Sequence, residues 1–286
     1  MKARAAYGWT FVAGVLIAGL VLGGAATRGT TDRERDGLVG LVHRVVSTTG
    51  GTSITKIYSR DGVLLETVTR SAPPADQPDV GERIERVVYE YDSQNRRRRE
   101  MIDEGDGIQY LSRAYAHDKS GRVLAEASYS MCGTFSSLTI YTYDDAGRLR
   151  EDLSYRLRSL FKRTYEFDSH GRIAFRRDYK NNGAISSTGY RYDEQGRLAE
   201  QSEFQPDGTL KSTVSYQYDR QGNQTLEETT NPADSSLNGT RASRYEFDAQ
   251  GNWIVRTVRR PVVPRDEEAS VEVTHRTIAY YGSSSE

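Results

Sequence analysis

The sequence predicts an all-β protein in which tandem β-hairpin repeats form one curled antiparallel meander sheet, preceded by an N-terminal hydrophobic helix. Three observations carry this prediction. A motif of the form Tyr-x-aromatic-Asp-x-x-Gly occurs seven times, about every 25 residues, which is the spacing of a stacked supersecondary unit. Apolar and polar residues alternate after each motif, and a long uncharged run lies near the N-terminus. These patterns leave undecided whether the sheet is open or closed into a shell.

The stretch "YRYDEQGR" at residues 190–197 shows the physics of one repeat. Side chains at i and i+2 of a strand point to the same side, so Tyr190 and Tyr192 share a face. Asp193 suits the first position of a tight turn, and Gly196 suits the fourth, where the backbone becomes left-handed. We therefore predict a type I turn closed by a glycine bulge in each repeat, with Asn95 replacing the glycine in the first.

The residues that define the repeats, which we expect to be structural, are Tyr89, Tyr91, Asp92 and Asn95; Tyr115, Asp118 and Gly121; Tyr141, Tyr143, Asp144, Gly147 and Arg148; Tyr165, Phe167, Asp168, Gly171 and Arg172; Tyr190, Tyr192, Asp193, Gly196 and Arg197; Tyr216, Tyr218, Asp219 and Gly222; and Tyr245, Phe247, Asp248, Gly251 and Trp253.

The strand after each turn carries apolar residues at alternate positions, such as Leu149, Leu153 and Tyr155. We expect these residues to continue the aromatic face across the hairpin. A second connection then returns the chain. Its length varies between repeats, which indicates the more exposed rim of the sheet.

The repeats divide the chain into five parts. Residues 1–26 are a signal peptide or membrane anchor, 27–36 a polar tether, 37–84 an opening hairpin and linker, 85–257 the seven repeats, and 258–286 a closing strand and tail. This division gives about sixteen strands, from two per hairpin. Charges on both faces of strands such as "RLAEQSEF" favour a sheet that lies in water over one that faces lipid.

The N-terminal segment predicts export. Lys2 and Arg4 precede an uncharged run that ends at Ala26, which fits either a cleaved signal peptide or a retained transmembrane helix. Both interpretations place the rest of the chain in the periplasm, at the cell surface or outside the cell, and the second anchors it in the inner membrane. Membrane contact is then expected only through residues 9–26.

The composition argues against several classes of function. With 39 basic and 40 acidic residues the net charge is −1, so no field attracts nucleic acid. The single cysteine, Cys132, rules out an intramolecular disulfide and is interpreted as a small turn or strand residue. Each Asp-x-x-Gly turn has one carboxylate, already used by the turn, so a calcium site is not expected. With no catalytic motif, we predict no enzymatic activity, cofactor or metal.

The motif strings "YTYDDAGRLRE", "YEFDSHGRI" and "YRYDEQGRLAE" resemble the YD repeats, also called Rhs repeats, over residues 85–257. In larger proteins of this family such repeats build a spiralling β-sheet shell around a toxin or C-terminal domain, or form cell-surface regions implicated in carbohydrate binding and cell contact. An Asp-Pro self-cleavage segment like that of the large shells is absent. The resemblance therefore implies a short exported bacterial type without a toxin domain.

Two features could carry binding. The aromatic face could stack on sugar rings, or it could be only the core of the sheet, which we favour. The arginines after the turn glycines, Arg122, Arg148, Arg172 and Arg197, should bond a neighbouring aspartate or stack on a neighbouring tyrosine. We expect a noncatalytic binding or structural module whose partner is an envelope glycan or another protein. The alternative is an accessory or remnant of a toxin-delivery system that binds a polypeptide.

Overall fold

A computed structural model describes residues 30–130, 132–260 and 270–282, and within them the chain forms one antiparallel sheet of eighteen strands. The strands are β1 (Val42–Thr49), β2 (Thr52–Tyr58), β3 (Leu64–Ser71), β4 (Arg83–Tyr91), β5 (Arg97–Asp103), β6 (Tyr110–His117), β7 (Val123–Tyr129), β8 (Phe135–Tyr143), β9 (Leu149–Arg156), β10 (Ser159–Phe167), β11 (Ile173–Lys180), β12 (Gly183–Tyr192), β13 (Leu198–Phe204), β14 (Leu210–Tyr218), β15 (Gln224–Thr230), β16 (Gly239–Phe247), β17 (Trp253–Arg260) and β18 (Ser270–Tyr280). The helical elements are α1 (Asp32–Arg35) and the 3₁₀ turns η1 (Pro78–Val80) and η2 (Ser235–Leu237).

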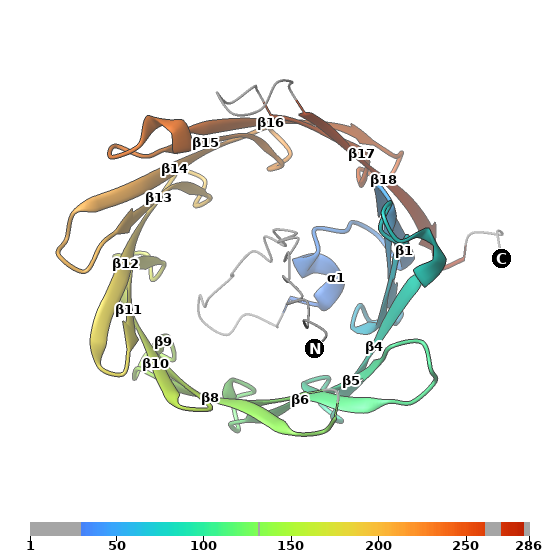
Figure 1. The fold of residues 1–286 in the computed structure, drawn as a ribbon, viewed down its shortest axis with the longest axis horizontal. Coiled ribbons are helices and arrows are strands. Elements are labelled where there is room, and N and C mark those ends of the chain that lie inside the picture. The colour runs from blue at the N-terminus through green and yellow to red at the C-terminus, as the bar shows by residue number, and fades with distance from the viewer. Residues whose placement is uncertain (1–29, 131, 261–269, 283–286) are drawn as a thin grey trace, which may run out of the picture.

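The sheet closes on itself. Each strand pairs with its neighbours in the chain, and β1 pairs with β18 as well as with β2, with Val45 opposite Ile278 and Thr49 opposite Thr274. The result is the ring of Figure 1. The predicted all-β antiparallel meander is confirmed. The strand number exceeds the expected sixteen because β1 and β18 flank the opening hairpin and the seven repeats.

The predicted turn geometry is confirmed. In the third repeat the Asp144 N–H donates to the Arg148 carbonyl at 2.8 Å, and the Gly147 N–H donates to the Asp144 carbonyl at 2.8 Å. Gly147 has a φ of 79°, and Asn95, which takes the glycine position in the first repeat, has a φ of 56°. These turns lie at one rim of the ring, and the second connections lie at the other.

The expectation that apolar residues after the turn continue the aromatic face is wrong for most of them. Tyr143 pairs with Leu149, but the register then shifts by one residue, so that Leu153 pairs with Ile140. A β-bulge inserts an extra residue and moves every later side chain to the opposite face. Tyr155 accordingly lies on the outer face, where it is 44% exposed.

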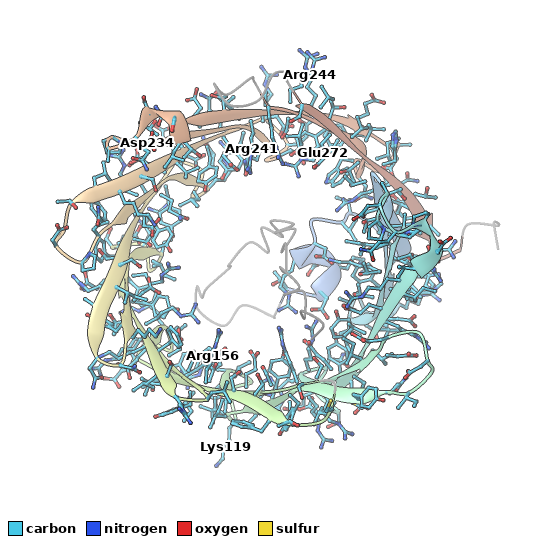
Figure 2. The ribbon with its side chains drawn as sticks, in the orientation of Figure 1. Lys119, Arg156, Asp234, Arg241, Arg244 and Glu272 are labelled. Carbon is cyan, nitrogen blue, oxygen red and sulfur yellow. The ribbon has the colours of Figure 1, made fainter. Side chains whose placement is uncertain are left out.

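The aromatic face lines the interior of the ring. α1 lies inside the ring in Figure 1, and the Tyr91 hydroxyl donates to Asp32 of α1 at 2.8 Å. In Figure 2, Arg156 and Arg241 project toward the interior, while Arg244 projects outward. We call the interior space the lumen and the wall that faces it the inner wall.

The buried apolar residues gather where the two ends of the ring meet. Leu38, Val42, Val45, Tyr58 and Leu64 form one cluster, from the segment after α1 and from β1, β2 and β3. We call this region, comprising α1, β1 to β3 and β18, the seam.

No helix among the described residues is long and apolar enough to cross a membrane. The predicted signal peptide or anchor at residues 1–26, with the hydrophobic helix expected there, lies outside the described residues.

Candidate ligand-binding lumen

The arginine after each turn glycine links two repeats. Nε of Arg148 donates to Oδ2 of Asp144 at 2.8 Å, and its guanidinium lies over the ring of Phe167 in the next repeat, 4.7 Å from the ring centre. The arginine therefore bonds an aspartate, as expected, and stacks on an aromatic ring of the next repeat, which here is a phenylalanine in place of the expected tyrosine. Three other arginines repeat this arrangement: Arg122 over Tyr143, Arg172 over Tyr192 and Arg197 over Tyr218.

The turn carboxylates are held as anions by the turn itself. Oδ1 of Asp92 accepts the N–H groups of Gln94 and Arg96 at 2.9 and 3.0 Å. The Arg96 N–H is the main cause that lowers the pKa of Asp92 to about 2. These carboxylates are therefore committed to the turns.

The second aromatic of the motif also joins neighbouring repeats. The Tyr143 hydroxyl donates to the Val123 carbonyl at 2.7 Å. The hydroxyls of Tyr192 and Tyr218 make the same bond to Ile173 and Leu198 in the preceding hairpins.

The first aromatic of the motif belongs to a polar belt around the inner wall. The Tyr165 hydroxyl donates to Asp152 at 2.7 Å, and Arg163 Nε donates to the same carboxylate at 3.0 Å. Asp152 is only 2% exposed. Tyr115 makes the corresponding bond to Glu100 at 2.8 Å. The ring face that we expected to be core is thus half-buried and meets the lumen with phenol, guanidinium and carboxylate groups.

Tyr216 and Tyr190 of this belt remain protonated at neutral pH. Burial raises the pKa of Tyr216 to about 12, with a further contribution from Glu227. Burial likewise raises the pKa of Tyr190. Protonated phenols can donate to a ligand while their rings offer a flat apolar surface.

A pocket of about 320 Å³ opens at the seam between the segment that follows α1 and the inner wall. Asp36 lies in it and accepts two bonds from Lys56 Nζ at 2.8 Å and a short hydrogen bond from Tyr58. Tyr89 and Arg276 also belong to its polar lining, with three hydroxyl side chains, Ser47, Thr67 and Thr69. The repeat motif did not identify the pocket residues outside the repeats; the only signal was the stretch "YSRDG" from Tyr58, a degenerate copy of that motif.

Residues 30–36, the described part of the predicted polar tether, are docked inside the ring. A capping box from Thr31 and Glu34 begins α1. Asp32 then accepts the Leu64 N–H at 2.9 Å and the Tyr91 hydroxyl at 2.8 Å. The inner wall therefore already binds one polar stretch of its own chain.

The last repeat is specialised. Asn252 stands where most other repeats have arginine, and it is 2% exposed. Its side chain donates to the Val39 carbonyl at 2.9 Å and accepts the Val39 N–H at 2.7 Å. Trp253, which follows it, lies beneath the guanidinium of Arg276, 3.4 Å from the ring centre.

The described residues contain no group of three or more His, Cys, Asp or Glu side chains that could hold a metal ion. Cys132 is a free, exposed turn residue.

Comparison with known proteins gives neighbours in structure alone. No protein-family model matches the sequence, and no curated protein matches it. A porin-like protein from Bacteroides uniformis is similar over 83% of this chain and 98% of its own, with 10% identity and a TM-score of 0.46. A porin-like protein from Bacteroides vulgatus is similar over 84% and 98%, with 12% identity and a TM-score of 0.37.

The Tc holotoxin pore of Photorhabdus luminescens is similar over 88% of this chain, with 15% identity and a TM-score of 0.32, but the match covers only 16% of that chain. At these identities and TM-scores the neighbours give no information about function. A functional proposal therefore depends on the residues that line the lumen.

Proposed function

We propose that this chain is an exported, noncatalytic YD-repeat protein of the bacterial envelope that binds carbohydrate in the lumen of its barrel. The periplasm or the cell surface is its place of action, with residues 9–26 as its membrane contact where they are retained.

One observation carries the proposal: a closed sheet surrounds a lumen whose wall is a belt of phenol, guanidinium and carboxylate groups. Tyr165 with Asp152, and Tyr115 with Glu100, are examples from two separate repeats. Sugars present hydroxyls at their edges and C–H groups on their faces, so half-buried tyrosines can contact both. The regular spacing of the belt suits a ligand with repeating units.

The charged pairs on the outer wall support the inference that water surrounds the barrel. Arg99 Nε donates to Glu90 at 2.8 Å, and Arg86 Nε donates to Glu66 at 2.8 Å, both on exposed outer positions. Charged pairs on an outer wall are costly against lipid and ordinary in water. The N-terminal sequence separately supports export of the chain.

The direct test is a pull-down of the full-length chain, purified in a polyoxyethylene detergent that carries no sugar, with isolated cell-wall material and a panel of polysaccharides. We expect saturable binding to at least one glycan, and loss of binding in a Tyr190→Ala/Tyr216→Ala variant, which removes two rings from the inner wall. Tyr155→Ala on the outer wall is the matched control and should bind as the wild type does. A chain that retains no glycan, or one in which Tyr155→Ala alone abolishes binding, contradicts the proposal.

The second candidate function is binding of a polypeptide, as an accessory or remnant of a toxin-delivery system. The docking of Asp32 against Leu64 and Tyr91 favours it, because the inner wall there holds a peptide segment. Affinity capture from the native envelope distinguishes the two: a stoichiometric polypeptide that competes with no glycan would favour this candidate.

A further inference from the structure

Two arginines of the inner wall have no carboxylate partner within residues 30–130, 132–260 and 270–282. Arg256 on β17 and Arg276 on β18 each have a buried Nε with no hydrogen-bond partner among the described residues. Arg256 reaches Ser243 Oγ at 3.4 Å, and Arg276 lies over Trp253. No carboxylate of the described chain comes within ion-pair distance of either guanidinium.

The other half-buried arginines of the inner wall are neutralised. Arg97 pairs with Glu100 at 3.1 Å, Arg163 with Asp152 at 3.0 Å, and Arg176 with Asp178 at 2.9 Å. At β17 and β18, by contrast, the two arginines act on each other and form no ion pair with any carboxylate in the described part of the chain.

The nearest acids are already engaged. Asp36, in the same pocket as Arg276, binds Lys56 and Tyr58. Glu272, on β18, pairs with Arg260 at 3.9 Å. The charge of Asp36 still acts to raise the pKa of Arg276, but neither carboxylate forms an ion pair with Arg256 or Arg276.

Burial and the neighbouring Arg256 lower the pKa of Arg276 to about 10, so the Arg276 side chain stays charged at neutral pH. A half-buried charge without a counter-ion is unfavourable, and a bound anion relieves that cost. Guanidinium groups bind planar oxyanions through paired N–H bonds, and carboxylates fit this geometry well.

We propose that Arg256 and Arg276 bind the carboxylate of an acidic sugar, so that the glycan held in the lumen is a uronic-acid-containing chain. Trp253, beneath Arg276, fixes the guanidinium in place, and the pocket of about 320 Å³ beside it gives room for one sugar unit. This assignment rests on the proposed function.

The test is titration calorimetry of the full-length chain with oligogalacturonate and with its carboxyl-reduced, neutral form. We expect at least tenfold tighter binding of the acidic form to the wild type. An Arg256→Gln/Arg276→Gln variant should lose that preference, while Arg99→Gln, which removes an outer-wall arginine paired with Glu90, should keep it. Equal affinity of the wild type for both forms, or a double variant that keeps the preference, overturns the assignment.

Two further measurements distinguish a loss of folding from a loss of binding. Removing two uncompensated charges should leave the Tm of the double variant at or above that of the wild type, so lost binding would not reflect unfolding. If the double variant binds the neutral glycan as the wild type does, the protein still binds carbohydrate. The two substitutions have then removed only the preference for the carboxylate. If neither glycan binds but sodium sulfate raises the Tm of the wild type and not of the double variant, the anion site stands and the carbohydrate function fails.

Discussion

The seam and the repeats close the same ring by different means. The seam has an apolar cluster that includes Leu38, Val42 and Leu64, whereas the repeats depend on turn hydrogen bonds, stacked arginines and tyrosines that bond the preceding hairpin. Repeat contacts are local and recur, so the loss of one leaves the others in place. The seam occurs once, and ring closure depends on it.

The largest effect is expected from a leucine pair with matched burial. Leu64 in the seam and Leu149 in a repeat are each 7% exposed. Leu64→Ala should lower the free energy of unfolding by about 2–5 kcal/mol, because it opens a cavity in the apolar cluster. Leu149→Ala should cost less, near the lower end of that range. Urea unfolding followed by tyrosine fluorescence measures both, and equal losses would remove the distinction between seam and repeats.

The next effect concerns the docked segment. Asp32→Asn removes the charge that faces Arg97 and weakens the bonds from Leu64 and Tyr91, so we expect a loss of about 1–3 kcal/mol. Asp61→Asn, at an exposed position of the adjacent turn, is the control and should be neutral. Proteolysis should cut the segment around residue 30 sooner in Asp32→Asn alone. Unchanged stability and cleavage in that variant would mean that α1 does not contribute to closure.

A smaller effect is expected in a single repeat turn. Gly222 has a φ of 87° and no atom within 4 Å of the position of an added Cβ, so Gly222→Ala meets only backbone strain, about 1–2 kcal/mol. Gly239→Ala also has open space but no left-handed backbone, and should be close to neutral. Thermal unfolding compares the two variants, and similar Tm values would contradict the turn geometry.

The smallest expected effect is the loss of stability when one turn aspartate is protonated at low pH. The folded pKa of Asp92, about 2, lies below the ordinary value near 4, so its contribution is present above pH 4 and is lost as the pH falls through 2. Asp92→Asn should therefore have a lower Tm than the wild type at neutral pH, and the gap should narrow toward pH 2. A gap that does not change with pH would show that the carboxylate charge is not what holds the turn.

The turns could be predicted from sequence because their causes lie within a few residues. Asp144 and Gly147 determine their own hydrogen bonds and backbone angles whatever surrounds them. The aromatic face followed from the i and i+2 spacing for the same reason.

Ring closure, the register after each bulge and the surroundings of Arg256 and Arg276 depend on contacts that a short sequence motif does not contain. The pairing of β1 with β18 joins Val45 to Ile278 across almost the whole chain. The bulge beside each turn moved residues such as Leu153 to the outer wall, against simple alternation. The lack of a carboxylate partner for Arg256 and Arg276 among the described residues appears only when the strands around them are placed.

The most direct test of the central claim, that a ligand occupies the lumen, uses two neighbouring residues on opposite faces of β13. Gln201 pairs with Tyr190 on the inner wall, and Ser202 bonds Thr213 on the outer wall. In a Cys132→Ser background, Gln201→Cys and Ser202→Cys would be alkylated with a maleimide, with and without oligogalacturonate. The account predicts that the glycan slows alkylation at 201 and leaves 202 unchanged. Equal rates at 201 with and without the glycan, or protection at 202, would contradict it.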